Sequence, residues 1–62
     1  MKTAELIRLL KKHGCYLLRH GSRHDVYKSP ITDTELMVGR HPKEEVATGT
    51  VRRILKDAGI KG

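Results

Sequence analysis

His24 is the side chain of this sequence best placed to transfer a proton. Imidazole changes charge near neutral pH and can both accept and donate a proton. His24 follows the tight turn Gly21-Ser22 and opens an expected strand, where a sheet would hold the side chain while solvent could still reach it. Proton transfer is therefore the chemistry that we expect at this position.

Basic residues surround His24. Arg23 precedes it, Lys28 follows on the same expected strand, and Arg19 lies on the strand expected to pair with it. A site that handles phosphate needs such cations beside its acid or base. On the alternation of a strand, Lys28 shares a face with His24 whereas Asp25 lies on the other, so we do not expect Asp25 to orient His24.

The other three histidines have weaker functional indications. His13 ends a helix, where a cation suits the helix dipole, and His41 precedes Pro42 and can cap the turn behind it. A structural role is favoured for both. His20 closes a strand beside the turn, and its pattern leaves two readings open, an exposed polar residue or a helper at the site.

Other catalytic schemes fit less well. Zinc would need three or four converging ligands, and the sequence has no paired Cys-x-x-Cys or His-x-x-x-His spacing. Ser22 is typical of a turn, and Cys15 lies in an apolar segment where a cysteine packs as a small hydrophobic residue. There is no phosphate-binding loop and no dinucleotide motif. We therefore expect neither a metal nor a cofactor.

The charge of the chain points to a polyanionic partner. Its 62 residues carry a formal net charge of +6, and the first half, residues 1–31, holds seven basic and two acidic residues. Nucleic acid is the first candidate and an acidic protein the second.

Size and cysteine content indicate how such a chain is stabilised. A chain this short buries a small core, and one cysteine allows no internal disulfide, which favours the cytoplasm. A partner chain or self-association would then add stability. No apolar run reaches the roughly 18 residues of a membrane span, and the first ten residues lack a secretory cleavage pattern, so we expect no membrane segment and no export.

Hydrophobic periodicity predicts five elements in the order αβββα. Apolar residues at helical spacing predict one helix over residues 3–13 with Thr3 as N-cap, and a second that begins after Thr50 as N-cap and is stopped by Gly59. Short apolar or alternating runs predict strands over residues 15–20, 24–28 and 35–39. Pro42 followed by Glu44 and Glu45 resembles the first turn of a further short helix. Connections this short favour an antiparallel sheet with the two long helices on one face, an α+β fold like that of double-stranded-RNA-binding domains.

Three segments in order carry a resemblance to a known family. They are GSRHDVY at residues 21–27, RHPKEEV at 40–46 and GTVRRILKDAGI at 49–60. Together they closely resemble the HicA family of type II toxin–antitoxin systems, also described as YcfA-like. The resemblance extends over nearly the whole chain, and residues 1–62 are accordingly expected to form one toxin domain.

The resemblance implies a cytoplasmic messenger-RNA endoribonuclease that is neutralised by a cognate HicB-like antitoxin. The family's single catalytic histidine falls in a Gly-Ser-x-His motif, which places that role on His24. Beside it, Arg19, Ser22, Arg23 and Lys28 are the residues expected to bind RNA. Cleavage is expected to be independent of metal ions.

Two other functions fit the same charge and fold. A non-catalytic RNA-binding module would bind RNA in a salt-sensitive way without cutting it, whatever residue stands at position 24. A protein-interaction domain would dock an acidic partner on its basic face and have negligible affinity for RNA.

Overall fold

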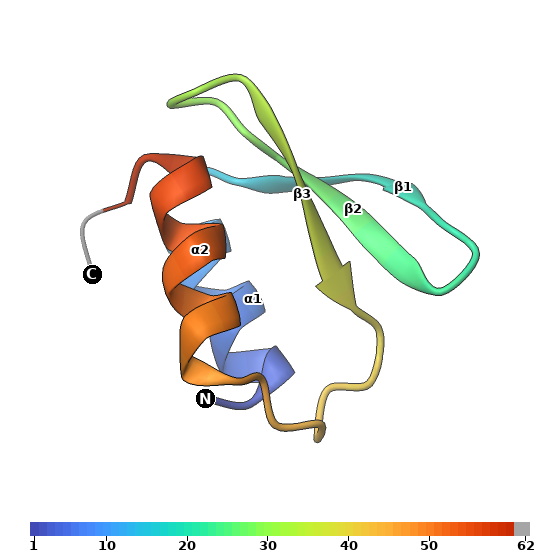
Figure 1. Cartoon of the computed structure of the whole chain (residues 1–62). Helices are drawn as coiled ribbons and strands as arrows, with labels where there is room; N and C mark the ends of the chain where they lie inside the picture. The colour runs from blue at the N-terminus through green and yellow to red at the C-terminus, as the bar shows by residue number, and fades with distance from the viewer. Residues whose placement is uncertain (61–62) are drawn as a thin grey trace.

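The computed structural model describes residues 1–60, which fold as a helix, three strands and a helix (Figure 1). The elements are α1 (Thr3–Lys12), β1 (Tyr16–His20), β2 (His24–Ser29), β3 (Thr34–Gly39) and α2 (Thr48–Ala58). This order confirms the predicted αβββα arrangement. None of the helices within residues 1–60 is long and apolar enough to cross a membrane.

The three strands form one antiparallel sheet in the order β1-β2-β3. In β2, His24 pairs with Gly39 and Tyr27 with Leu36, so the β2–β3 register has no irregularity. The β1–β2 register shifts between Leu17 and Arg19, as at a β-bulge. The central strand is therefore β2, and it carries His24 at its first position.

Both helices cover the same face of the sheet and lie side by side (Figure 1). Leu6 and Leu10 of α1 are fully buried, and the apolar residues that α2 places three or four residues apart are buried as well, with Ala58 at 0% exposure. They pack against alternate residues of the sheet. The core consists of Leu6, Leu10, Cys15, Tyr27, Leu36, Val38, Val51, Ile54, Leu55, Ala58 and Ile60. The amphipathic pattern of each helix thus matches the face it buries.

The N-caps predicted for the two helices were wrong, whereas α2 ends at Gly59 as its C-cap. Thr3 is the first residue of α1 and not its N-cap, because its hydroxyl donates to the carbonyl of Glu44 at 3.1 Å. Thr50 lies inside α2, which begins two residues earlier at Thr48 and has Ala47 as N-cap. Neither helix has a side-chain cap.

The segment after β3 is a turn, and the short helix predicted from Pro42, Glu44 and Glu45 does not form. Instead, its backbone pairs with the start of the chain. The amide of Thr3 donates to the carbonyl of Glu44 at 2.9 Å, and the amide of Val46 donates to that of Met1 at 2.8 Å. An isolated β-bridge also joins Lys2 to Glu45. These contacts hold the segment beside the edge strand β3.

Candidate active site

The turn between β1 and β2 places His24 at the end of the sheet. The amide of Gly21 donates to the carbonyl of His24 at 2.8 Å and closes the turn. A Cβ atom at Gly21 would lie 2.5 Å from that carbonyl oxygen, so only glycine allows this close approach. The glycine of the Gly-Ser-x-His pattern is therefore required by the geometry of the backbone, independently of any catalytic role.

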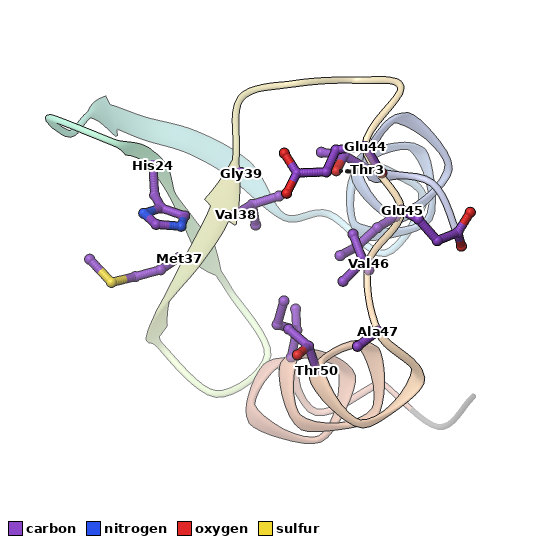
Figure 2. Close-up of a pocket in the computed structure, with 12 residues that line it drawn as sticks. Thr3, His24, Met37, Val38, Gly39, Glu44, Glu45, Val46, Ala47 and Thr50 are labelled. Atoms are coloured by element: carbon purple, nitrogen blue, oxygen red, sulfur yellow. Dashed lines mark hydrogen bonds between the residues drawn. The ribbon is translucent and has the colours of Figure 1, made fainter.

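The imidazole of His24 lies on the face of the sheet that the helices leave uncovered. Strand alternation separates it from Tyr27, which belongs to the core on the opposite face. His24 is exposed, and Figure 2 shows its ring beside Met37 on the same side of β3. Of the imidazoles in residues 1–60, those of His13 and His20 hydrogen-bond to the protein. The ring of His24 is thus open to an incoming substrate.

Two of the three predicted phosphate-binding cations are engaged in ion pairs. Arg19 donates to Glu35 at 2.9 Å, and the Lys28 ammonium lies 3.1 Å from Asp33. The Asp33 carboxylate raises the pKa of Lys28 above its ordinary value. Sequence reasoning missed both acidic partners, although Glu35 is the cross-strand neighbour of Lys28. The strand register would have found Glu35, whereas Asp33 lies in the turn before β3, outside the paired residues.

The remaining predicted contacts lie in the turn itself. Ser22 and Arg23 are both exposed between β1 and β2, two residues and one residue before His24, respectively. Arg23 has no salt bridge within residues 1–60, so it is the cation near His24 that is free to meet a phosphate.

Asp25 faces away from His24, as the alternation predicted, and joins a different cluster. Its Oδ1 accepts from Nδ1 of His20 at 2.8 Å and from Nε of Arg40 at 3.1 Å. The hydrogen bond from His20, followed by that from Arg40, holds the pKa of Asp25 below its ordinary value. The sequence left the role of His20 open between an exposed polar residue and a helper at the site. In the structure its hydrogen bond to Asp25 links the end of β1 to β2, and the bond from Arg40 to the same carboxylate links the residue after β3 to β2.

A groove of about 220 Å³ runs along the free edge of β3 next to His24 (Figure 2). One wall is the edge of β3 with Met37 and Gly39, and the other is the segment that precedes α2. The carboxylate of Glu44 points toward the end of β3, whereas that of Glu45 points away (Figure 2). Within the described residues, 1–60, no lysine or arginine lines this groove.

The other reactive side chains form no site. Residues 1–60 contain no group of three histidine, cysteine or acidic side chains that could hold a metal ion. Cys15 is buried in the core at 3% exposure, as predicted for a small hydrophobic residue. His13 hydrogen-bonds to the carbonyl of Leu9 at 3.1 Å, in line with its structural role.

Comparison with known proteins gives one match. A family model described as HicA toxin of bacterial toxin-antitoxin matches residues 3–60, nearly the whole chain. No curated protein and no solved structure gives a significant match.

Proposed function

We propose that this chain, which belongs to the HicA toxin family of bacterial toxin–antitoxin systems, is an endoribonuclease that cleaves messenger RNA. Family membership makes the chain a toxin and implies a cognate antitoxin as its partner. The observation that supports endoribonuclease activity, beyond membership of the family, is the position of His24. It stands at the start of the central strand, on the uncovered face of the sheet and beside Arg23, which has no salt bridge within residues 1–60.

The mechanism follows from one imidazole among cations. His24 accepts the proton of a ribose 2′-hydroxyl, whose oxygen attacks the adjacent phosphorus while the bond to the 5′-oxygen breaks. The products are a 2′,3′-cyclic phosphate and a 5′-hydroxyl, and the leaving oxygen takes its proton from the imidazolium or from water. One positioned acid or base contributes on the order of 10²- to 10⁴-fold. The proposed reaction needs no metal ion.

The cations around His24 then hold the phosphate. Arg23 can do so directly, whereas Arg19 and Lys28 must exchange a carboxylate for a phosphate oxygen. Ion pairs this exposed stabilise a protein by only about 0–1 kcal/mol, so the exchange is inexpensive. The hydroxyl of Ser22, exposed in the same turn, can donate to a phosphate oxygen as well.

The central test is the variant His24→Ala. We expect it to fold and bind the antitoxin like the wild type but to lose cleavage of a messenger-RNA substrate and toxicity on induction. His13→Ala is the matched control, because His13 is also exposed but lies at the end of α1. Cleavage by His24→Ala at the wild-type rate would overturn the assignment, and salt-sensitive binding without any cleavage by the wild type would identify a non-catalytic RNA-binding module.

A second measurement tests metal independence. Cleavage by the purified wild type should continue in excess EDTA, because the imidazole supplies the proton transfer. If a chelator abolished cleavage and a divalent ion restored it, the proposed mechanism would be wrong even though the toxin assignment stood.

A third measurement concerns the antitoxin. We propose that it covers the face that carries His24, with acidic side chains in place of the phosphates. Saturating the toxin with antitoxin should then abolish the gel shift of a labelled RNA. RNA binding that persisted in the saturated complex would place inhibition at another surface.

A further inference from the structure

The groove along the free edge of β3 has the size and lining of a site for one flat ring. Its volume of about 220 Å³ is below the roughly 300–1,000 Å³ of pockets that take drug-sized ligands. Its apolar lining includes Met37, Val46, Ala47 and Ile54. The side chains of Val46, Ala47 and Ile54 can pack against a face of a nucleobase. The thioether of Met37, 66% exposed, lies on the His24 side of β3 (Figure 2), where it can make a sulfur–aromatic contact with a ring beside His24.

Away from His24, the charge of the groove is unfavourable for a phosphate. Glu44 would repel an anion, and no lysine or arginine of residues 1–60 lines the groove to offset it. Glu45 forms an ion pair with the N-terminal amine, which lowers the pKa of its carboxyl. Glu44 has no such ion pair within residues 1–60, and its carboxylate is directed into the gap beside Gly39 (Figure 2). Glu44 is therefore the carboxylate without an ion pair that this groove offers as a hydrogen-bond acceptor.

The backbone of Glu44 is held firmly. Its amide donates to the carbonyl of His41 at 3.1 Å, and its carbonyl accepts from both the amide and the hydroxyl of Thr3, at 2.9 and 3.1 Å. Thr3 is itself 2% exposed. This network fixes the backbone from which the Glu44 side chain extends, so the point of attachment of the carboxylate is in place before a ligand arrives.

An open path joins the groove to His24. Gly39 is the cross-strand partner of His24, and a Cβ atom at Gly39 would meet nothing within 4 Å. In Figure 2 the end of β3 at Gly39 lies between the imidazole and the Glu44 carboxylate. An RNA strand whose phosphate lies at His24 could thus pass around this bare edge and place a neighbouring base in the groove.

We propose that the groove binds one base next to the cleaved phosphate and that Glu44 selects guanine there; this inference rests on the proposed ribonuclease function. Guanine presents two adjacent donors on its Watson–Crick edge, which the two oxygens of a carboxylate can accept together. Uracil presents one donor between two carbonyl oxygens, which the carboxylate repels. Single-stranded RNA is commonly recognised through these edges. A good bidentate contact discriminates by about 1–3 kcal/mol, which corresponds to about 5- to 150-fold.

The test uses the full chain and an RNA pool with a randomised single-stranded segment. Sequencing the cut ends should show guanine enriched over uracil by about 5- to 150-fold at one position beside the cleaved bond. Glu44→Gln, whose amide replaces one acceptor by a donor, should still cleave but lose this enrichment. Glu45→Gln is the matched control, because the neighbouring carboxylate points away (Figure 2), and it should keep the enrichment.

The outcomes separate this inference from the function on which it rests. Cleavage by Glu44→Gln with unchanged base preference, or a wild type with no preference for guanine, overturns the role of Glu44 and leaves the ribonuclease standing. If the wild type does not cleave at all, the proposed function fails. The groove is then tested by binding alone: His24→Ala and His24→Ala/Glu44→Gln are titrated with oligonucleotides that differ only in guanine or uracil, and equal affinities in the first protein overturn the inference.

Discussion

The hydroxyl of Ser29 links the sheet to the end of α2 by a hydrogen bond. Removing this hydroxyl should destabilise the fold more than the substitution of any exposed polar residue. Ser29 is the last residue of β2 and is 0% exposed. Its hydroxyl donates to the carbonyl of Ala58 at 2.6 Å and accepts from the amide of Ile31 at 3.3 Å. Ala58, also 0% exposed, is the last residue of α2, so this carbonyl has no partner within its own helix.

The variant Ser29→Ala leaves that buried carbonyl without its donor. A buried acceptor that loses its partner costs about 1–3 kcal/mol in the free energy of unfolding. A chain of this size has a total of about 3–9 kcal/mol, at roughly 0.05–0.15 kcal/mol per residue. The substitution should therefore remove a large part of the stability and lower the Tm by about 4–8 °C for each kcal/mol.

Thr32→Val is the matched control. The hydroxyl of Thr32 donates to the carbonyl of Asp57 at the same distance, 2.6 Å, but this bond is exposed and water can replace it. Its loss should change the free energy of unfolding by no more than about 0.5 kcal/mol. Urea denaturation followed by circular dichroism measures both variants. Equal losses, or a Ser29→Ala protein as stable as the wild type, would refute the argument from burial.

Three further predictions concern the charges and the core. Because His20 and Arg40 lower the pKa of Asp25, the ionised carboxylate stabilises the fold above the ordinary carboxyl pKa of about 3.9, and this contribution disappears as the pH falls through the lowered value. Asp25→Asn should thus have a lower free energy of unfolding than wild type at pH 7 and lose less of it on acidification. If the urea midpoints of the two proteins fell by the same amount between pH 7 and pH 3, this prediction would be contradicted. Leu6→Ala, at a fully buried position, should lose about 2–5 kcal/mol of the free energy of unfolding and be largely unfolded at 37 °C. If this variant unfolded cooperatively at the Tm of the wild type, Leu6 would not be part of the core. The thiol of Cys15 should react with Ellman's reagent far more slowly in native protein than in urea, and equal rates would show that it is exposed.

The elements could be predicted because each shows its own period. Val51, Ile54, Leu55 and Ala58 recur at helical spacing, and all four are buried in α2. Alternation in residues 24–28 correctly separated His24 and Lys28 from Asp25. These are local patterns, and the packing of two helices on a three-stranded sheet satisfies all of them at once.

The helix starts and the segment after β3 could not be predicted, because contacts distant in sequence determine them. Thr3 looks like a cap in isolation, yet its hydroxyl is used by the carbonyl of Glu44, 41 residues away. The same contact holds the turn around Pro42 beside the N-terminus, and the short helix that its residues favour does not form. Propensity is a weak guide where tertiary hydrogen bonds compete with it.

The electrostatics of the candidate site show a similar limit. The sequence contains many basic residues around position 24, but it does not show which of them are paired. Only the register brings Glu35 within reach of Arg19. A net charge of +6 therefore overstates the positive potential at the site, where Arg23 alone among the predicted cations lacks a salt bridge within residues 1–60.

The turn at residues 21–24 joins the requirements of folding to those of the proposed chemistry. Gly21 is needed because a Cβ atom would collide with the carbonyl of His24, which means that the residue that closes the turn also sets the backbone of the proposed base. Any substitution at Gly21 must therefore move His24 or break the hydrogen bond that starts β2. A Gly-Ser-x-His motif is then expected wherever this hairpin presents a histidine at its end. The motif alone indicates the close approach of the glycine to the histidine carbonyl, and it does not by itself indicate catalysis. The claim that this geometry performs catalysis rests on the imidazole itself, which is why His24→Ala, and not a glycine variant, is the decisive test.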